Sequence, residues 1–187
     1  MFDFYMDAHM HFDLYDDRSE ILRYVKQKAS YTIAMTNLPQ LFEKYKRQYV
    51  GNKYFQLALG FHPELVHQYS NQQVLFKELI NETRFIGEIG LDYTKKSKED
   101  VMCQTEIFEK IIEWCSGKNK ILSVHSRSAS KKVVDILNGF DGSSDILLTI
   151  QPALSTGSVS LVSTNSLLSV TSVILSPTLT TFTSGEL

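Results

Sequence analysis

Cysteine is scarce in this sequence and follows no pattern typical of a zinc site or a disulfide framework. The chain has two cysteines among 187 residues, Cys103 and Cys115, and both lie in a stretch with a helical pattern. Their number and spacing exclude a zinc finger, which needs closely paired ligands, and a small secreted domain held together by many disulfides. We therefore expect reduced thiols in a cytoplasmic protein.

A strong excess of either charge is also absent. Nineteen lysines and arginines face 21 aspartates and glutamates, which gives a formal charge of -2. This balance excludes a protein that coats nucleic acid through charge alone, because such binding depends on many contacts from basic side chains to phosphates. A nucleic-acid substrate would have to be held by metal ions and by local groups.

The first residues lack the features of a secretory leader or membrane anchor. The segment MFDFYMDAHMHF carries acidic residues within its apolar run and has no basic region before it. We expect neither a signal peptide nor a contact with the membrane. With 43% hydrophobic residues, the chain can bury the core of one domain, while its composition predicts no particular oligomeric state.

Up to about residue 150, short apolar runs alternate with amphipathic stretches. The runs typical of strands are 4–11, 31–36, 55–59, 85–89, 121–125 and 146–150. The stretches with a helical period are 18–28, 40–49, 73–81, 99–115 and 130–137. Strands that alternate with helices in this way indicate βαβ units and a parallel sheet.

The character of the sequence changes at Gln151. Residues 151–187 contain no lysine, arginine, aspartate or histidine, and serine and threonine dominate. One interpretation is a Ser/Thr-rich linker or a disordered tail. The other is translation out of frame, because codons that permit residues 153–158 read as Ile-Ile-His-Trp-Phe when each begins one base earlier. Both interpretations divide the chain into a domain of residues 1–150 and a tail of residues 151–187.

Two histidines stand two residues apart at the end of the first apolar run. In a strand, Asp7, His9 and His11 would project from the same face. Two imidazoles side by side on a rigid strand can chelate a divalent metal. The alternative is an exposed strand end that happens to carry two histidines, and the pair alone does not decide between them.

Further polar residues lie within or directly after the other apolar runs. Glu88 stands inside an apolar strand, where a carboxylate is costly unless it is paired or bound to metal. His125 ends another such strand, and a metal ligand is favoured over a buried structural histidine. His62 before Pro63 fits either a substrate contact or a turn, and Arg127 fits either a phosphate contact or a helix cap. In a parallel β/α barrel, residues at these positions meet in one mouth.

Four motifs that contain these residues follow one another along the chain: Asp7-Ala8-His9-Met10-His11, Gly60-Phe61-His62-Pro63, Gly87-Glu88-Ile89-Gly90-Leu91-Asp92 and His125-Ser126-Arg127. In this order they resemble the TatD family of metal-dependent deoxyribonucleases, within the amidohydrolase-like TIM-barrel superfamily. The resemblance covers residues 1 to about 150, and the Gly-Glu-Ile-Gly-Leu-Asp motif is its most specific part.

The resemblance implies a hydrolase that cleaves phosphodiester bonds in DNA with two divalent metal ions, Mg, Mn or Zn. It assigns His9, His11, Glu88 and His125 as metal ligands, with Glu88 as the catalytic residue that bridges the ions. We take His62 and Arg127 as substrate-binding residues. The alternatives are an amidohydrolase-like enzyme acting on an amide, lactone or ester, and a catalytically inactive binding fragment.

The family pattern also has a later histidine, within a His-Cys/Trp-Phe-Ser-Gly motif, and a late aspartate. This sequence has no histidine after His125 and no aspartate after Asp145. A full β/α barrel takes about 250 residues. We therefore expect an incomplete TIM barrel of about the first five to six β/α units, with little or no nuclease activity in the 1–187 chain.

The out-of-frame interpretation can be tested on the nucleotide sequence around codons 148–158. We expect the reading frame shifted by one base to stay open and to encode the missing histidine motif. Stop codons at once in that frame, or a frame without the histidine, would show that the tail is native.

Overall fold

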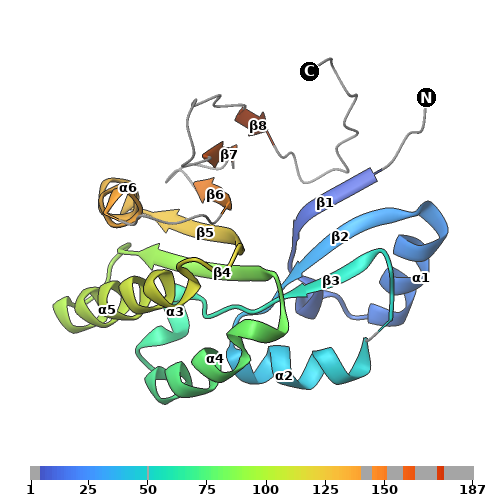
Figure 1. Ribbon diagram of the computed structural model, residues 1–187, viewed down its shortest axis with the longest axis horizontal. Coiled ribbons are helices and arrows are strands. Elements are labelled where there is room, and N and C mark those ends of the chain that lie inside the picture. The colour runs from blue at the N-terminus through green and yellow to red at the C-terminus, as the bar shows by residue number, and fades with distance from the viewer. Residues whose placement is uncertain (1–4, 50, 140–144, 151–157, 163–171, 175–187) are drawn as a thin grey trace.

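The structure is a computed structural model that describes residues 5–49, 51–139, 145–150, 158–162 and 172–174. Strands and helices alternate along most of this length (Figure 1). The strands are β1 (Tyr5–Met10), β2 (Ser30–Met35), β3 (Phe55–Ala58), β4 (Phe85–Asp92), β5 (Ile121–Arg127), β6 (Asp145–Ile150), β7 (Ser158–Val162) and β8 (Ser172–Ile174). The helices are α1 (Arg18–Lys28), α2 (Pro39–Gln48), α3 (Pro63–Val66), α4 (Gln73–Leu79), α5 (Lys98–Cys115) and α6 (Ser130–Asn138), with 3-10 turns η1 (Phe12–Leu14), η2 (Ser70–Gln72) and η3 (Ile80–Glu82).

The first six strands are parallel and follow one another in space. β1 pairs with β2 and β2 with β3, while β4 pairs with β5 and β5 with β6. A parallel bridge from Leu59 to Ile86 joins the two groups, with the Leu59 amide 2.9 Å from the Phe85 carbonyl oxygen. The strand order therefore matches the chain order, as in successive right-handed β/α units.

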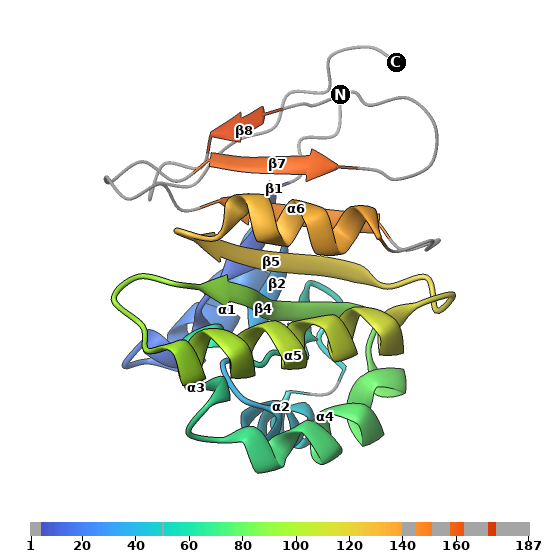
Figure 2. The same cartoon turned by 90° about the vertical axis from the view of Figure 1, so that its left-hand side faces the viewer.

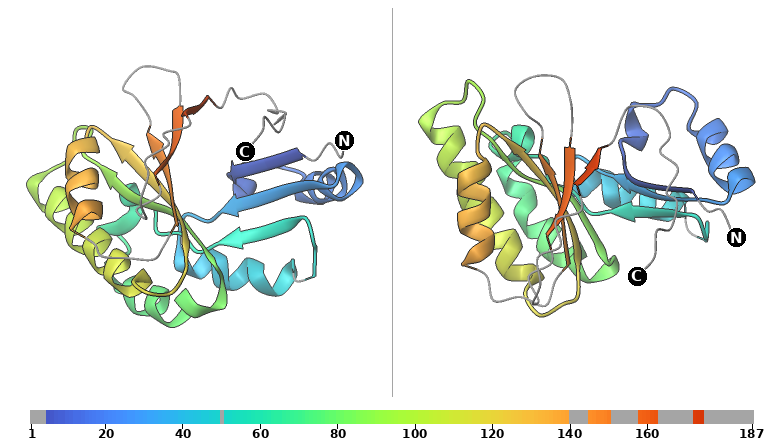
Figure 3. Two further views of the ribbon diagram at one scale, coloured as in Figure 1. Left: turned by 45° about the horizontal axis from the view of Figure 1, so that its top comes forward. Right: turned by 90° about the horizontal axis from the view of Figure 1, so that it is seen from above.

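The sheet curves without closing. Within the described residues, β1 pairs only with β2, and β8 pairs only with β7, so these two strands are the edges of the sheet (Figure 3). The predicted α/β fold, an incomplete TIM barrel, is confirmed. Figure 2 shows α5 and α6 lying along the outer face, over β4 and β5.

The predicted elements are found with small shifts at their ends. β4 extends to Asp92 and β5 to Arg127, so each strand carries more of its motif than the apolar run indicated. The short helix α3 was not predicted, because four residues are too few to show a helical period. It begins at Pro63, whose fixed backbone angle suits the first position of a helix.

The described parts of the Ser/Thr-rich tail extend the sheet in another way. β7 pairs antiparallel with β6, and β8 antiparallel with β7. These residues therefore add a meander in place of further β/α units. The rest of the tail lies outside the described residues, and the division of the chain at residue 150 stays a prediction.

The main core lies between the sheet and its covering helices. The predicted stripe on α5 is buried, with Phe108 fully enclosed and Ile107, Ile111 and Ile112 beside it. The capping box formed by Ser97 and Asp100 fixes the beginning of this helix. No disulfide joins the two cysteines, and burial raises the pKa of Cys115 to about 12. Among the described helices, none has both the length and the apolar character needed to span a bilayer.

Two glycines let neighbouring strands approach closely at the end of the sheet where the motifs lie. A Cβ at Gly60 would be 1.5 Å from the Thr36 carbonyl oxygen on the neighbouring strand's end. Gly90 has a φ of +131°, and a Cβ there would be 2.1 Å from the His125 carbonyl oxygen. Glycine is required at both positions, because any side chain would force these strands apart.

We expect Gly60→Ala to lower the free energy of unfolding by roughly 3 kcal/mol or more, at the upper end of the cost of overpacking. Gly139→Ala is the matched control, because a Cβ there meets its nearest atom at 3.5 Å, an ordinary contact. Urea denaturation followed by circular dichroism measures both. Equal stabilities of the two variants would contradict the close approach at Gly60.

Candidate metal centre

The predicted site residues come from different strands but meet at one edge of the sheet. His9 lies near the end of β1, Glu88 lies in β4 and His125 lies in β5. His11 directly follows β1, and His62 precedes α3. Since the strands are parallel, their carboxyl ends share this edge, where β/α-barrel enzymes place their catalytic groups.

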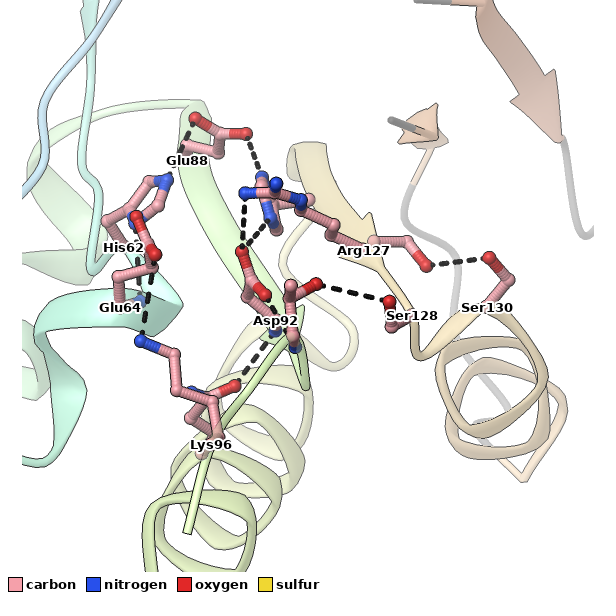
Figure 4. Close-up of polar contacts among 12 residues, drawn as sticks. His62, Glu64, Glu88, Asp92, Lys96, Arg127, Ser128 and Ser130 are labelled. Atoms are coloured by element: carbon pink, nitrogen blue, oxygen red, sulfur yellow. Dashed lines mark hydrogen bonds and ion pairs between the residues drawn. The ribbon is translucent and has the colours of Figure 1, made fainter. Parts of the chain in front are cut away.

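The Glu88 carboxylate is the centre of the cluster. Its Oε2 atom lies 3.2 Å from His11 Nε2, 3.7 Å from His9 Nε2 and 3.6 Å from His62 Nε2. Its Oε1 atom lies 2.9 Å from His125 Nδ1. The side chain is 2% exposed, so almost all of its polar contacts come from protein groups. The structure thus brings the four predicted metal ligands together, with His62 beside them. Figure 4 shows His62 beside Glu88.

Irregularities in two strands direct the key side chains. The pairing of β1 shifts register between Asp7 and Met10, around His9, and that of β4 shifts between Ile86 and Ile89, around Glu88. Such bulges turn side chains away from the regular alternation of a strand. His9 and His11 do not share a strand, because β1 ends at Met10. Their side chains nevertheless meet as expected, with the two Nε2 atoms 3.2 Å apart.

The first histidine is oriented by two further contacts. His9 Nδ1 lies 2.9 Å from Ser123 Oγ on β5, and the His9 amide donates to Asp7 Oδ1 at 3.1 Å. A proton on Nδ1 directed to Ser123 leaves the lone pair of His9 Nε2 facing Glu88 and His11. Asp7 therefore supports the backbone of the motif and lies outside both groups of candidate metal ligands.

The charge of the cluster is concentrated on Glu88. Burial by itself raises the pKa of its carboxyl, but hydrogen bonds with His11, His125 and His9 outweigh burial and hold the pKa well below its ordinary value. The hydrogen bond with Glu88 raises the pKa of His11. Burial lowers the pKa of His125, but the hydrogen bond and charge of Glu88 outweigh it and leave the pKa raised. The carboxylate is therefore ionised and attracts positive charge onto its neighbours.

His62 has a different electronic state. Its Nδ1 accepts a hydrogen bond from the Glu64 amide at 3.3 Å, as the cap of α3, so the proton of the neutral ring lies on Nε2. Burial lowers the pKa of His62, which favours the neutral form. The nitrogen that faces the site is therefore a hydrogen-bond donor, as suits a contact to substrate better than a metal ligand.

Arg127 lies farther out, at the rim of the cluster. Its Nη1 atom is 3.8 Å from Asp92 Oδ2, and the side chain is 42% exposed. It does not cap α6, whose N-cap residue is Ala129 without a side-chain hydrogen bond. Nearby, Lys96 pairs with Glu64 at 3.6 Å (Figure 4). Arg127 thus stands beside the buried carboxylate of Asp92, where a phosphate group could bind, while the partner of Lys96 is the half-exposed Glu64.

Two neighbours of the ligands were not assigned any role from the sequence. Asp92 is buried at the end of β4, with Oδ2 3.3 Å from His125 Nε2. Ser123 contacts His9 from the middle of β5. The sequence could have indicated Asp92, because a residue four positions after Glu88 on the same strand lies on the same face of the sheet. Ser123 had no comparable signal.

The donor atoms suit a divalent cation. Two groups have their ligand atoms within 4.8 Å of one another, His9 with His11 and Glu88, and His62 with Glu88 and His125. Imidazole nitrogens with a carboxylate suit zinc and related transition metals. His11 Nδ1 is buried without a hydrogen-bond partner in the described structure, so Nε2, which faces Glu88 at 3.2 Å, is the nitrogen that can bind a cation once its proton is displaced.

A curved parallel sheet with a histidine–carboxylate cluster at its carboxyl edge has the architecture of a β/α-barrel enzyme. The family model of TatD related DNase matches residues 6–175. The chain therefore belongs to the TatD family, which is a family of hydrolases.

Individual relatives agree with this assignment. The chain is 31% identical over 88 residues to the Homo sapiens protein described as "3'-5' RNA nuclease TATDN2", over 44% of this chain and 11% of that protein. The structure of YJJV, a TatD homolog from Escherichia coli, has a TM-score of 0.61 at 19% identity and matches 72% of this chain and 55% of its own. An uncharacterized amidohydrolase from Saccharomyces cerevisiae has a TM-score of 0.54 at 20% identity, over 72% and 51% of the two chains. The chain thus spans about half the length of these structures and a smaller part of the curated relative.

Metal binding should release protons near pH 6.5, the ordinary pKa of histidine. His11 and His125 have raised pKa values, so a cation that binds their nitrogens must displace protons, and metal affinity falls as the pH is lowered through these values. We expect about one proton or more released per chain on zinc binding. Calorimetric titrations in two buffers of different ionisation enthalpy measure it, with exposed His67→Ala as the unchanged control. Heats independent of the buffer would contradict the assignment.

Proposed function

We propose that the protein hydrolyses phosphodiester bonds in DNA with the help of two divalent metal ions. The observation that carries this proposal is the position of Glu88, a buried carboxylate with one oxygen toward His9 and His11 and the other toward His125. A carboxylate with histidines on both sides is suited to bridge two cations. TatD family membership supports hydrolysis of a nucleic acid.

The ligands divide into two sets. His9, His11 and Glu88 would hold one ion, and Glu88 with His125 would contribute to the second. Magnesium, manganese and zinc are the candidates, and imidazole-rich ligation favours zinc over the other two. Such ions, when bound, lower the pKa of a coordinated water and neutralise charge on the phosphate under attack.

The remaining residues act on the substrate. His62 presents its Nε2 proton to the site and can donate it in a hydrogen bond to a phosphate oxygen while the ring stays neutral. Arg127 and Lys96 offer charge-assisted hydrogen bonds to neighbouring phosphates. Because the chain as a whole has a formal charge of -2, these local cations have to supply most of the attraction for a polyanion.

Three other functions stay open to test. The relative TATDN2 is described as an RNA nuclease, and one structural neighbour is described as an amidohydrolase. An ester or amide could bind the same histidine–glutamate cluster, since metal activation of water serves all these reactions. A binding fragment without catalysis is the third possibility, since the sequence has neither a histidine after His125 nor an aspartate after Asp145.

Nuclease activity should be measured with the 1–187 chain in excess over end-labelled single-stranded DNA and over RNA of the same sequence. Because the sequence has neither the later histidine nor the late aspartate of the family pattern, we expect at most slow cleavage of DNA, which requires Mg, Mn or Zn and stops with EDTA. His9→Ala and Glu88→Gln should reduce the rate at least 100-fold, because each removes a ligand and loss of even an outer partner typically costs 10–100-fold.

His67→Ala is the matched control, because this histidine lies on the surface 2.7 Å from Asp100 and away from Glu88. It should keep the wild-type rate. Preferential cleavage of RNA would replace DNA as the substrate, and cleavage of p-nitrophenyl acetate alone would favour an esterase. No metal-dependent turnover of any of these substrates would show that the chain is a binding fragment.

A further inference from the structure

Asp92 is held in one orientation at the end of β4. Its Oδ1 atom accepts a hydrogen bond from the Thr94 amide at 2.9 Å, and its own amide donates to Gln104 Oε1 at 2.8 Å. The residue is 1% exposed. These contacts turn the other oxygen, Oδ2, toward His125 Nε2 at 3.3 Å and Arg127 Nη1 at 3.8 Å (Figure 4).

The His125 ring thus lies between two carboxylates. Nδ1 faces Glu88 Oε1 at 2.9 Å, and Nε2 faces Asp92 Oδ2 at 3.3 Å. A neutral imidazole carries one proton, so only one of these nitrogens can present a lone pair. The position of that proton decides whether His125 can bind a cation on the side of Glu88.

We propose that Asp92 is a positioning residue that accepts the Nε2 proton of His125 when a cation beside Glu88 takes the Nδ1 lone pair, and that the same Asp92 oxygen holds Arg127 at the rim. This proposal rests on the metal centre of the proposed function. Histidine ligands in metal sites commonly donate their second ring nitrogen to a carboxylate in this way.

Glu88 and Asp92 are both possible acceptors for the proton of His125, but they differ in how many other partners they have. Glu88 already receives contacts from His9, His11 and His62, and a cation bound beside it would occupy its oxygens. Asp92 Oδ2 has His125 as its nearest partner, with Arg127 farther away. With a cation on the side of Glu88, the only ring proton of His125 lies on Nε2, where Asp92 Oδ2 can accept it in a hydrogen bond.

The contact with Arg127 links this ligand to the rim. Asp92 is buried, while the Arg127 side chain is 42% exposed, so the acid fixes one end of a group whose other donors are accessible. A guanidinium has five N–H donors, and one contact with Asp92 leaves the others for phosphate oxygens. One carboxylate oxygen therefore sets the positions of both a metal ligand and a phosphate-binding residue.

Asp92→Asn separates this role from a structural one. The amide oxygen of asparagine would take the place of Oδ1, where the Thr94 amide donates, and its NH2 group would then face His125 Nε2. An NH2 group is a donor, so His125 would have to accept at Nε2 and carry its proton on Nδ1. The lone pair would be lost from the side of Glu88.

Nitrogen-15 NMR of histidine-labelled, zinc-bound protein reports directly which ring nitrogen of His125 carries the proton. His125 is assigned by the loss of its signals in His125→Gln. We expect the Nε2–H tautomer in the wild type and the Nδ1–H tautomer in Asp92→Asn, with zinc affinity roughly 10–100-fold lower in the variant. Asp135→Asn, the same change at an exposed position on α6, should keep the tautomer and the affinity.

An Nδ1–H tautomer in the wild type would overturn the proposal even if Asp92→Asn failed to fold. A variant with an unchanged tautomer and zinc affinity within twofold of wild type would assign Asp92 to structure alone. None of these measurements depends on turnover. A chain that cleaves no nucleic acid can therefore still support or contradict the role of Asp92, which keeps this test separate from that of the proposed function.

Discussion

The burial of an ionised carboxylate at Glu88 is the constraint on which the rest of the site depends. A charge removed from water is costly unless other groups replace its hydration. Here the replacement comes from histidines on separate segments, His9 and His11 from one and His125 from another. The bulges in β1 and β4 and the close strand contacts at Gly60 and Gly90 all serve to bring these groups within reach of one side chain.

This constraint explains why an open sheet has the curvature of a barrel. β1 and β5 are not neighbours, because β2, β3 and β4 lie between them. His9 on β1 nevertheless contacts Ser123 on β5 at 2.9 Å, across the concave side of the sheet. A flat sheet would hold these strands several strand spacings apart, each about 4.8 Å. The site and the curvature therefore require each other, even though the described strands do not complete the circle.

Most of the fold could be predicted from the sequence, because its helices show a clear apolar stripe and its strands are short apolar runs between them. The stripe on α5 is one example, with Phe108 at its centre. The motif residues of the site could be named because each follows or interrupts such a run. Asp92 and Ser123 were not identified from the sequence, because their importance comes from contacts with the candidate metal ligands His125 and His9 and not from a sequence pattern of their own. The antiparallel β7 and β8 were not predicted either, because the Ser/Thr-rich stretch is interpreted from the sequence as a linker or an out-of-frame tail, even though β7 alternates polar and apolar residues.

The contact between His9 and Ser123 also has a consequence for the order of events in folding. The two residues are 114 positions apart in the chain, so closing this contact costs more conformational entropy than any pairing of neighbouring strands. During synthesis the histidines of β1 leave the ribosome well before β5 exists. The complete cluster can form only after the sheet has curved, and a divalent cation would bind tightly only to chains that have reached that stage. Metal binding would thus select the folded chain, and its free energy would add to the stability of a late step.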